Sequence, residues 1–310
     1  MDWDAIIIGG GAAGLSAAMM LGRARRRVLV LDAGEPRNRF ASHMHGVLGH
    51  DGLPPAELLR RGREEVAQYG VEVSPDRATR VGISGGVVQV TTEAGDSLFG
   101  RRLLVTTGLV DRLPDVPGLA ARWGKDAFAC PYCHGYEVRD RRIGVLATSE
   151  LTLHQAQLLR QWSDRITFFG HGAGELPADL RRRLGARGVV IEEEAVSRVL
   201  VDDDAISGVE LTGGRVVPID ALVTASTMVP GDGFLAGLDL ERTGTPMGEF
   251  LTVDRMQRTS NPLIHAAGNV SNPGGAVPAA VAEGAMAGSA INWALVEEDF
   301  DRAIEEEEAA

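Results

Sequence analysis

The chain is poor in cysteine, in lysine and in long apolar runs. It holds two cysteines and one lysine, Lys125, among 310 residues, and its formal net charge is −12. Such a charge argues against nucleic acid or an anionic membrane as a partner. No run approaches the roughly 18 apolar residues of a membrane span, and the N-terminus shows no basic, signal-type segment. We therefore expect a cytoplasmic protein.

Both cysteines lie in a single Cys-x-x-Cys, formed by Cys130 and Cys133. A reducing cytoplasm disfavours a structural disulfide, so the pair is either redox-active or metal-binding. Structural zinc takes four ligands, and the chain has no second cysteine pair. His134 adjoins Cys133, and His154 is too far away to complete a zinc pattern. Redox chemistry is the favoured interpretation, chemically inert cysteines are a further alternative, and we expect no metal site.

The order of elements at the N-terminus predicts a βαβ unit. Residues 4–9 are expected to form a buried parallel strand, residues 12–23 a helix and residues 27–31 a second strand. A helix over 54–69 and short strands over 71–73, 86–92 and 103–106 follow.

The same order of elements begins again after a proline-rich link at residues 112–118. Here we expect a strand over 142–146, a helix over 150–162 and a strand over 166–169. The repeat predicts an α/β fold with two Rossmann-like, dinucleotide-binding domains. We place a discontinuous domain over residues 1–111 and 236–310, and a smaller inserted domain over residues 112–235. A terminal helix is expected over 276–297, with a frayed acidic tail at 305–310.

The segment Gly9-Gly10-Gly11-Ala12-Ala13-Gly14 matches G-x-G-x-x-G between a strand and a helix. Gly9 allows the tight turn, Gly11 lets the backbone approach a pyrophosphate, and Gly14 lets the helix pack close to the strand. The helix begins at Ala12 and Ala13, where free N–H groups would meet the phosphates. Asp32, beside Ala33, follows at a strand end and would accept hydrogen bonds from a ribose. The alternative is a glycine-rich turn that binds nothing, and the motif alone does not separate FAD from NAD.

Two later segments are similar to the second and third FAD fingerprints of flavoproteins with two dinucleotide folds. They are Leu104-Val-Thr-Thr107-Gly108 and Ile264-His-Ala-Ala-Gly268-Asn269-Val. The resemblance implies FAD as the cofactor. In most relatives an aspartate stands at the position of Asn269 and holds the ribityl chain, and an amide can still donate and accept there. A helix starting at Ala276 and Val277 would point its N-terminus at the pyrimidine edge of the flavin.

The cysteines lie in Ala129-Cys130-Pro131-Tyr132-Cys133-His134-Gly135-Tyr136-Glu137. The chain resembles the low-molecular-weight thioredoxin reductases over nearly its whole length. This segment is most similar to the branch with the gliotoxin- and holomycin-type dithiol oxidases, in which histidine replaces the acid after the second cysteine. The resemblance implies that Cys133 is nearer the flavin and Cys130 more exposed. His134 is a candidate general acid or base, since an unperturbed pKa of about 6.5 suits proton transfer near neutrality. The alternative is a surface histidine.

The loop after Asp32 contains Arg37, His43 and His45. In relatives this loop covers the isoalloxazine ring, so the resemblance implies that Arg37 and either His45 or His43 lie near the flavin. The alternative is polar loop residues without that role. The resemblance also implies a homodimer, to which the terminal helix would contribute.

The second domain has lost the features of a nucleotide site. Thioredoxin reductases bind NADPH there through another glycine-rich turn, but this chain has Ala147, Ser149 and Thr152 at the three small positions. Each added Cβ crowds the pyrophosphate, and Glu150 adds a repelling charge. The next strand ends in Phe169-Gly-His-Gly-Ala-Gly174 without the arginine that would hold a 2′-phosphate. NADPH use is therefore disfavoured, although arginines elsewhere in this domain could form an unusual site: Arg160, Arg165 and Arg181 to Arg183.

Three functions remain open. The favoured one is a dithiol oxidase, in which electrons pass from a small dithiol or a thioredoxin-like protein through Cys130–Cys133 to FAD and then O2. The products would be a disulfide and hydrogen peroxide. The second is a thioredoxin reductase-type enzyme fed by NADPH or by another donor such as ferredoxin. The third is a flavin redox sensor without turnover, against which the intact cysteines and glycines count.

Overall fold

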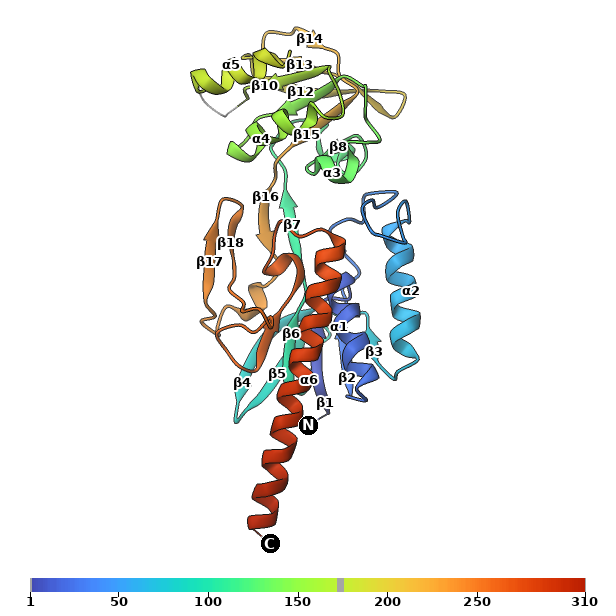
Figure 1. Cartoon of the computed structure of the whole chain (residues 1–310), viewed down its shortest axis with the longest axis vertical. Coiled ribbons are helices and arrows are strands. Elements are labelled where there is room, and N and C mark those ends of the chain that lie inside the picture. The colour runs from blue at the N-terminus through green and yellow to red at the C-terminus, as the bar shows by residue number, and fades with distance from the viewer. Residues whose placement is uncertain (1, 172–175, 310) are drawn as a thin grey trace. The chain divides into compact units, whose positions relative to one another are not determined.

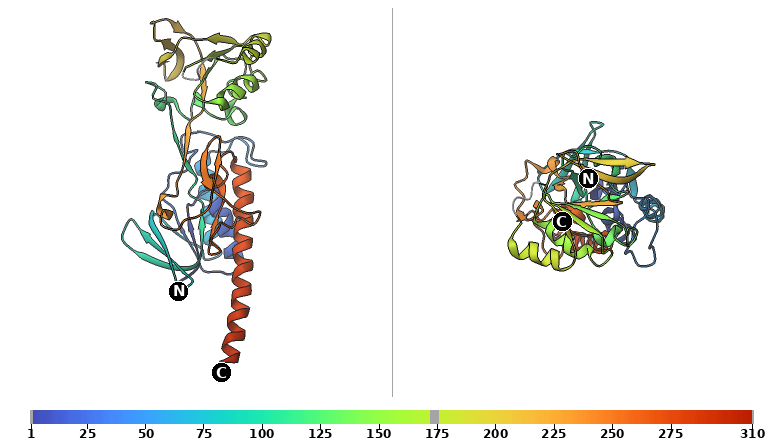
Figure 2. Two further views of the ribbon diagram at one scale, coloured as in Figure 1. Left: turned by 90° about the vertical axis from the view of Figure 1, so that its left-hand side faces the viewer. Right: turned by 90° about the horizontal axis from the view of Figure 1, so that it is seen from above.

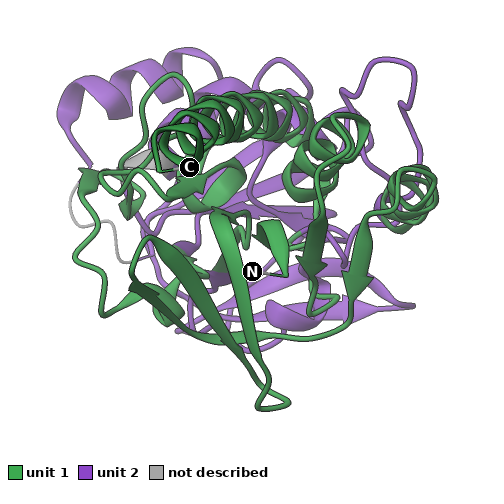
Figure 3. Ribbon diagram, turned by 90° about the horizontal axis from the view of Figure 1, so that it is seen from below, with its two compact units in different colours: residues 1–37, 56–110, 228–310 green, residues 38–55, 111–227 purple. Residues whose placement is uncertain are grey.

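The fold is described by a computed structural model that covers residues 2–171 and 176–309. Gly172, Ala173 and Gly174 of the second-domain segment lie outside the described residues. The chain divides into two compact units (Figure 3). The first comprises residues 1–37, 56–110 and 228–310, and the second comprises residues 38–55 and 111–227. The domain limits expected from the sequence stay a prediction. The two units differ from them chiefly because the loop 38–55 belongs to the second unit.

The first unit is built on a seven-stranded sheet in the order β3-β2-β1-β6-β5-β4, with β19 paired to β6 (Figure 1). Strands β1, β2, β3, β6 and β19 run parallel, and β4 and β5 continue the sheet antiparallel. The strands are β1 (Trp3–Ile8), β2 (Val28–Leu31), β3 (Glu72–Ser74), β4 (Ala78–Ser84), β5 (Val87–Thr92), β6 (Ser97–Val105) and β19 (Ile264–Ala266). The strand β4 was not expected from the sequence.

Successive side chains of β1 point to opposite faces of the sheet, so this strand contributes to a hydrophobic core on each face. Ala5 and Ile7 pack with α1 (Ala12–Arg23), α2 (Pro55–Ala67) and α6 (Val277–Glu308). Ile6 and Ile8 pack on the opposite face with β4, β5 and β19. The hairpin β17 (Arg242–Thr245) and β18 (Gly248–Leu251) and the short helices η2 (Gly233–Leu235) and η3 (Gly268–Val270) complete this unit.

Helix α6 packs backbone to backbone on α1. A Cβ on Gly284 would overlap the carbonyl of Ala13, and one on Gly288 would lie 2.8 Å from the carbonyl oxygen of Ala17. The C-terminal turns of α6 run past the sheet of this unit (Figure 2). The helix continues to Glu308, so the expected fray at 305–310 was wrong for the described residues. Glutamate is a good helix former, and Arg302 pairs with Glu298 one turn earlier at 3.1 Å.

Among the described residues, α6 alone has the length and apolar composition of a possible membrane span, with a mean hydropathy of 1.2 over 18 residues. This stretch is not an unbroken apolar run, because Glu283 and Asn292 interrupt it. Ala287, Ile291 and Leu295 of this helix are buried in the core of the first unit.

The second unit holds a five-stranded parallel sheet in the order β11-β10-β9-β15-β8 and an antiparallel sheet β12-β13-β14. The first contains β8 (Ala127–Phe128), β9 (Ile143–Leu146), β10 (Ile166–Phe169), β11 (Val190–Glu192) and β15 (Ala221–Thr224). The second contains β12 (Val196–Asp202), β13 (Ala205–Leu211) and β14 (Val216–Val217). The helices are η1 (Ala120–Arg122), α3 (Pro131–His134), α4 (Glu150–Leu159) and α5 (Ala178–Ala186).

The chain changes unit at residues 37–38 and 55–56, and again on β7 (Leu109–Arg112) and β16 (Thr227–Pro230), which pair with each other. The predicted α/β class, with two Rossmann-like parts, is confirmed.

Candidate functional site

The turn between β1 and α1 requires glycine at two positions. Gly9 has φ +108°, and a Cβ there would lie 2.5 Å from the carbonyl oxygen of Thr106. A Cβ on Gly14 would overlap the carbonyl of Gly9. The hydroxyl of Thr106 donates to the Gly9 carbonyl at 2.7 Å and fixes the turn from the neighbouring strand. These contacts allow the start of α1 to lie close against the sheet.

Gly11 differs from its two neighbours in the motif, because a Cβ there would meet no atom within 4 Å. It precedes α1, whose N-terminus has no side-chain cap. The first-turn N–H groups of Ala12, Ala13 and Gly14 therefore lack an intrahelical partner. An open space beside uncapped N–H groups at the positive end of a helix suits a phosphate. These residues fit the pyrophosphate of a dinucleotide.

Asp32 lies at the end of β2, where a ribose was expected. Its Oδ2 accepts a hydrogen bond from Arg63 at 2.8 Å, and its Oδ1 accepts one from the backbone N–H of Gly34 at 3.2 Å. A Cβ on Gly10 would lie 2.6 Å from this carboxylate, so Gly10 is also constrained, which sequence reasoning missed. Ala33 is exposed beside Asp32.

The segment after β6 carries a buried hydroxyl. The Oγ1 of Thr107 is shielded from solvent and has no hydrogen-bond partner among the described residues. Gly108 follows with φ +66°, and its carbonyl accepts from the N–H of Gly231 at 3.1 Å. A buried hydroxyl without a partner is costly and calls for an explanation, and a bound ligand would supply one.

The loop from η3 to α6 is held by a carboxylate that sequence reasoning did not single out. Glu283 accepts from the N–H of Gly268 at 2.8 Å and from the amide of Asn272 at 2.6 Å. The sequence feature that could have indicated this role is that Glu283 is a single acidic residue within a run of small apolar residues. Ala276 is the N-cap of α6 and Val277 its first residue, and no side chain caps this end.

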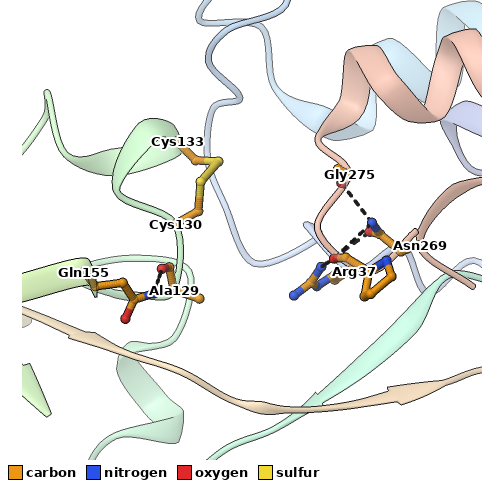
Figure 4. The surroundings of a disulfide bond; sticks show 8 residues. Arg37, Ala129, Cys130, Cys133, Gln155, Asn269 and Gly275 are labelled. Atoms are coloured by element: carbon orange, nitrogen blue, oxygen red, sulfur yellow. Dashed lines mark hydrogen bonds between the residues drawn. A yellow bond between two sulfur atoms is a disulfide. The ribbon is translucent and has the colours of Figure 1, made fainter. Parts of the chain in front are cut away.

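Asn269 and Arg37 meet in the same unit (Figure 4). The Asn269 Nδ2 donates to the carbonyls of Asn272 at 2.9 Å and Gly275 at 2.8 Å. The Arg37 Nη1 lies 3.4 Å from both the Asn269 Oδ1 and the carbonyl oxygen of Pro273.

Cys130 and Cys133 form a disulfide in the second unit, with their Cα atoms 5.3 Å apart, a usual separation (Figure 4). Cys130 is the N-cap of the four-residue helix α3, and Pro131 takes its first position. Gln155 of α4 donates to the carbonyl of Ala129 at 2.5 Å, which fixes the chain just before the disulfide. Gln155 was not predicted, because its contact joins residues far apart in sequence.

His134 lies at the end of α3, stacked on Phe128 with ring centroids 5.1 Å apart. Its Nδ1 is shielded from solvent without a partner among the described residues. Burial lowers the pKa of His134, Glu137 opposes that shift, and His45 adds to it. The imidazole is therefore neutral near pH 7, the form that accepts a proton.

His45 lies between two carboxylates of the second unit. Its Nδ1 is 3.4 Å from Asp51 and its Nε2 is 3.4 Å from Glu137, three residues after His134. The Gly46 N–H and then His45 lower the pKa of Asp51. His43 contacts Ser42 instead, at 2.9 Å. The loop 38–55 is thus tied to the segment with the cysteines, and a place for His45 near a flavin stays a prediction.

The start of α4 is capped by the chain itself. The Thr152 Oγ1 lies 3.3 Å from the backbone N of Thr148 and 3.4 Å from that of Ser149, within hydrogen-bonding distance, and donates to the Ser149 carbonyl at 2.5 Å. Thr152 is fully buried. The side chain of Glu150 lies outside the described residues. Two backbone N–H groups of the turn before α4 are therefore engaged by a buried side chain of the chain itself.

Two arginines of this unit, Arg160 and Arg181, are engaged by the chain itself. Arg181 pairs with Glu193 at 2.7 Å, and Arg160 donates to the carbonyls of Arg187 and Ser163. His171, after β10, accepts a hydrogen bond from the N–H of Val196 at 3.1 Å.

Comparison with known proteins agrees with this architecture. The family model described as pyridine nucleotide-disulphide oxidoreductase matches residues 3–284, and the chain belongs to this family. Membership implies a flavin cofactor.

Similar proteins agree with the expected branch. "Thioredoxin reductase sirT" of Leptosphaeria maculans is 34% identical, over 96% of this chain and 96% of its own. "Thioredoxin reductase tcpT" of Claviceps purpurea is 31% identical, over 94% of each chain. The crystal structure of HlmI has a TM-score of 0.94 and 44% identity, covering 98% of this chain and 95% of its own. The resemblance to the thioredoxin reductase-like family, on the branch of the gliotoxin- and holomycin-type enzymes, is confirmed.

Proposed function

We propose that the chain is an FAD-dependent dithiol oxidase that converts a dithiol and O2 into a disulfide and hydrogen peroxide. The observation that carries the proposal is the self-capped start of α4. The hydroxyl of Thr152 accepts from the backbone N–H groups of Thr148 and Ser149, in the turn that aligns with the glycine-rich turn of an NADPH site. A chain with a redox disulfide and no nicotinamide site must take its electrons from another donor, and a dithiol is the donor that a disulfide accepts directly.

The residues proposed to hold FAD come from the first unit. The first-turn N–H groups of α1 and the open space at Gly11 suit its pyrophosphate, and Asp32 suits its ribose. The buried hydroxyl of Thr107, the loop at Asn269 and Arg37 complete the set. When bound, FAD supplies a two-electron acceptor that dioxygen can reoxidise.

The cysteine pair performs the thiol chemistry. One substrate thiolate attacks a sulfur of Cys130–Cys133, so the disulfide breaks and a mixed disulfide forms. The second substrate thiol attacks the mixed disulfide, releases the oxidised product and leaves both cysteines reduced. Two electrons and two protons per substrate then reach O2 and form one H2O2, which balances the reaction.

His134 is proposed as the proton acceptor for these thiols. Its neutral form is favoured by burial, and it directly follows Cys133. The pair His45 and Glu137 would influence this histidine through charge, because both contribute to the shift in its pKa.

The partners are proposed from chemistry alone: a small-molecule dithiol or a thioredoxin-like protein, with O2 as acceptor, in the cytoplasm. We further propose a homodimer to which α6 contributes. Trp293 and Phe300, one heptad apart and therefore on the same face of α6, are 65% and 69% exposed, and an apolar face of this kind can serve as an interface.

Oxygen uptake tests the proposal. With dithiothreitol as substrate, the flavin-loaded protein should consume one O2 for each disulfide formed, and added catalase should return half of that oxygen. Sustained uptake with NADPH alone would instead favour a reductase fed by nicotinamide. A sensor would show neither reaction at a useful rate.

A further inference from the structure

Tyr132 lies between the two cysteines on α3 and projects from the second unit. It is 76% exposed, so most of its ring is available for contact. Cys130 and Cys133, on either side of it in the sequence, are both partly exposed. A molecule that reaches the disulfide therefore has this ring within reach.

Trp162, which follows α4, holds the ring of Tyr132 in place. The two ring centroids lie 5.8 Å apart at an interplanar angle of 87°, the edge-to-face geometry that aromatic pairs prefer. Trp162 is itself fixed by its surroundings. It packs on the core that contains Phe128, and its carbonyl accepts a hydrogen bond from the N–H of Asp140 at 2.9 Å. Tyr132 is thus an exposed ring with a supported orientation.

Gly135 allows the end of α3 to lie close against the same tryptophan. A Cβ on Gly135 would lie 3.0 Å from the Cδ2 of Trp162 and 2.5 Å from the carbonyl oxygen of Pro131. Because no side chain stands between them, the indole supports both the tyrosine and the short helix that carries the cysteines.

The charged side chains that follow Tyr132 are engaged by other groups. The carboxylate of Glu137 lies 3.4 Å from the Nε2 of His45. The guanidinium of Arg139 lies 4.2 Å from the centre of the Tyr136 ring and donates to the Tyr136 carbonyl at 2.8 Å. The ring of Tyr132 therefore offers an uncharged surface, which suits an apolar group better than an ionised one.

We propose that Tyr132 is a specificity-determining residue that favours dithiols with a flat apolar ring, and that Trp162 is its positioning residue. The inference rests on the proposed use of a dithiol as electron donor. While the mixed disulfide exists, the substrate is bonded to a sulfur of α3, so a ring beside its thiols lies within reach of Tyr132. Contact between the two rings stabilises the bound substrate and the transition state alike, and so lowers KM without raising kcat.

Two small dithiols with the same carbon spacing between their thiols separate this contact from the thiol chemistry. Dithiothreitol has a polar chain, and ortho-benzenedimethanethiol carries an aromatic ring. Oxygen uptake by the flavin-loaded protein gives kcat and KM for each. For Tyr132→Ser we expect the KM for the aromatic dithiol to rise about three- to tenfold with kcat unchanged, and both constants for dithiothreitol to stay near the wild type. Tyr132→Phe keeps the ring and should behave as the wild type.

Variants of Trp162 test the positioning role. Trp162→Leu should show the same selective rise in KM, although Trp162 is not proposed to touch the substrate, and Trp162→Phe should keep most of the preference. The matched control is Trp123→Leu, because Trp123 is a partly buried tryptophan of the same unit that packs on a different core. The ratio of the two KM values should stay that of the wild type in Trp123→Leu. The same result in Trp162→Leu would refute the positioning role.

The proposal is overturned if Tyr132→Ser alters KM for both dithiols by the same factor, or for neither. It is also overturned if only reduced thioredoxin becomes a poorer substrate, since the ring would then serve a protein partner. Failure of the proposed function is distinguishable. Without oxygen, the reaction of each dithiol with Cys130–Cys133 can be followed by maleimide labelling of the freed cysteines, after acid quenching and removal of the dithiol. Absence of oxygen uptake contradicts the oxidase, whereas the labelling rates still test the ring.

Discussion

Two glycines of the G-x-G-x-x-G motif, Gly11 and Gly14, have different surroundings in the turn after β1. Gly14 is needed for the fold, because a Cβ there would overlap the Gly9 carbonyl. Gly11 is free of such contacts. Glycine is therefore required for folding at position 14 and is available for ligand binding at position 11.

Gly11→Val should separate these two roles. We expect a folded protein that purifies without flavin and whose Tm is close to that of the flavin-free wild type, because the new side chain would fill the space left for a pyrophosphate. Absorbance at 450 nm relative to 280 nm measures the flavin content. Gly244→Val is the control, since a Cβ there also meets nothing within 4 Å. A Gly11→Val protein with normal flavin content would refute the assignment of this site.

Cys133→Ser should leave the flavin bound and abolish its reduction by thiols. Serine preserves the size of the side chain but cannot form the disulfide with Cys130. The flavin spectrum should remain that of the oxidised form after dithiothreitol is added without air, under conditions that bleach the wild type. Continued turnover by the variant would exclude Cys133 as the relay.

His265 makes stability depend on pH. It is 1% exposed on β19, and its pKa is lowered to about 4, chiefly by burial and then by Arg102. The unfolded chain binds a proton near pH 6.5 and the folded chain does not, so stability falls as the pH drops from 6.5 toward 4. The loss reaches about 3 kcal/mol. Urea unfolding should show this slope in the wild type and a reduced slope in His265→Gln; an equal slope in both would contradict it.

At the scale of elements, the contact between α1 and α6 depends on the absence of side chains. Ala13 and Ala17 on α1 face Gly284 and Gly288 on α6. The two helices approach closely enough for backbone to meet backbone, so a single methyl group has no room.

Gly284→Ala should therefore destabilise the protein by about 1–3 kcal/mol, the usual cost of overpacking. Gly185→Ala in α5 is the matched control, because its Cβ meets nothing within 4 Å. Replacing that glycine should stabilise the helix by roughly 0.5–1 kcal/mol. Opposite signs in urea unfolding are the expected result, and a neutral Gly284→Ala would contradict the described packing.

Elements fixed by local pattern could be predicted from the sequence. The glycine turn, α1 and β2 follow from neighbouring residues, and the loss of glycine at the start of α4 was visible directly. β4 was missed because Arg80 and Gly82 interrupt its apolar pattern, and its stability comes from pairing with β5. The end of α6 could not be predicted, because a terminal run of acidic residues is typical of a frayed tail, whereas here it continues the helix to Glu308.

At the scale of the whole molecule, the chain combines an intact first nucleotide turn with an altered second one. The contacts that complete the candidate sites join residues far apart in sequence, as Gln155 does with Ala129 and His45 with Glu137. Residue types and spacing could not reveal these pairs, because only folding brings them together. Cys130 and Cys133 could be predicted from the sequence, but the residues that hold the surrounding segment in place, such as Gln155, could not.

The central claim is that electrons enter through the disulfide from a dithiol and not from NADPH. The most direct test is rapid mixing of the flavin-loaded protein with each reductant in the absence of oxygen, followed at 450 nm. The account predicts that dithiothreitol bleaches the flavin, that NADPH does not, and that air restores the colour with release of hydrogen peroxide. Bleaching by NADPH within seconds would contradict it.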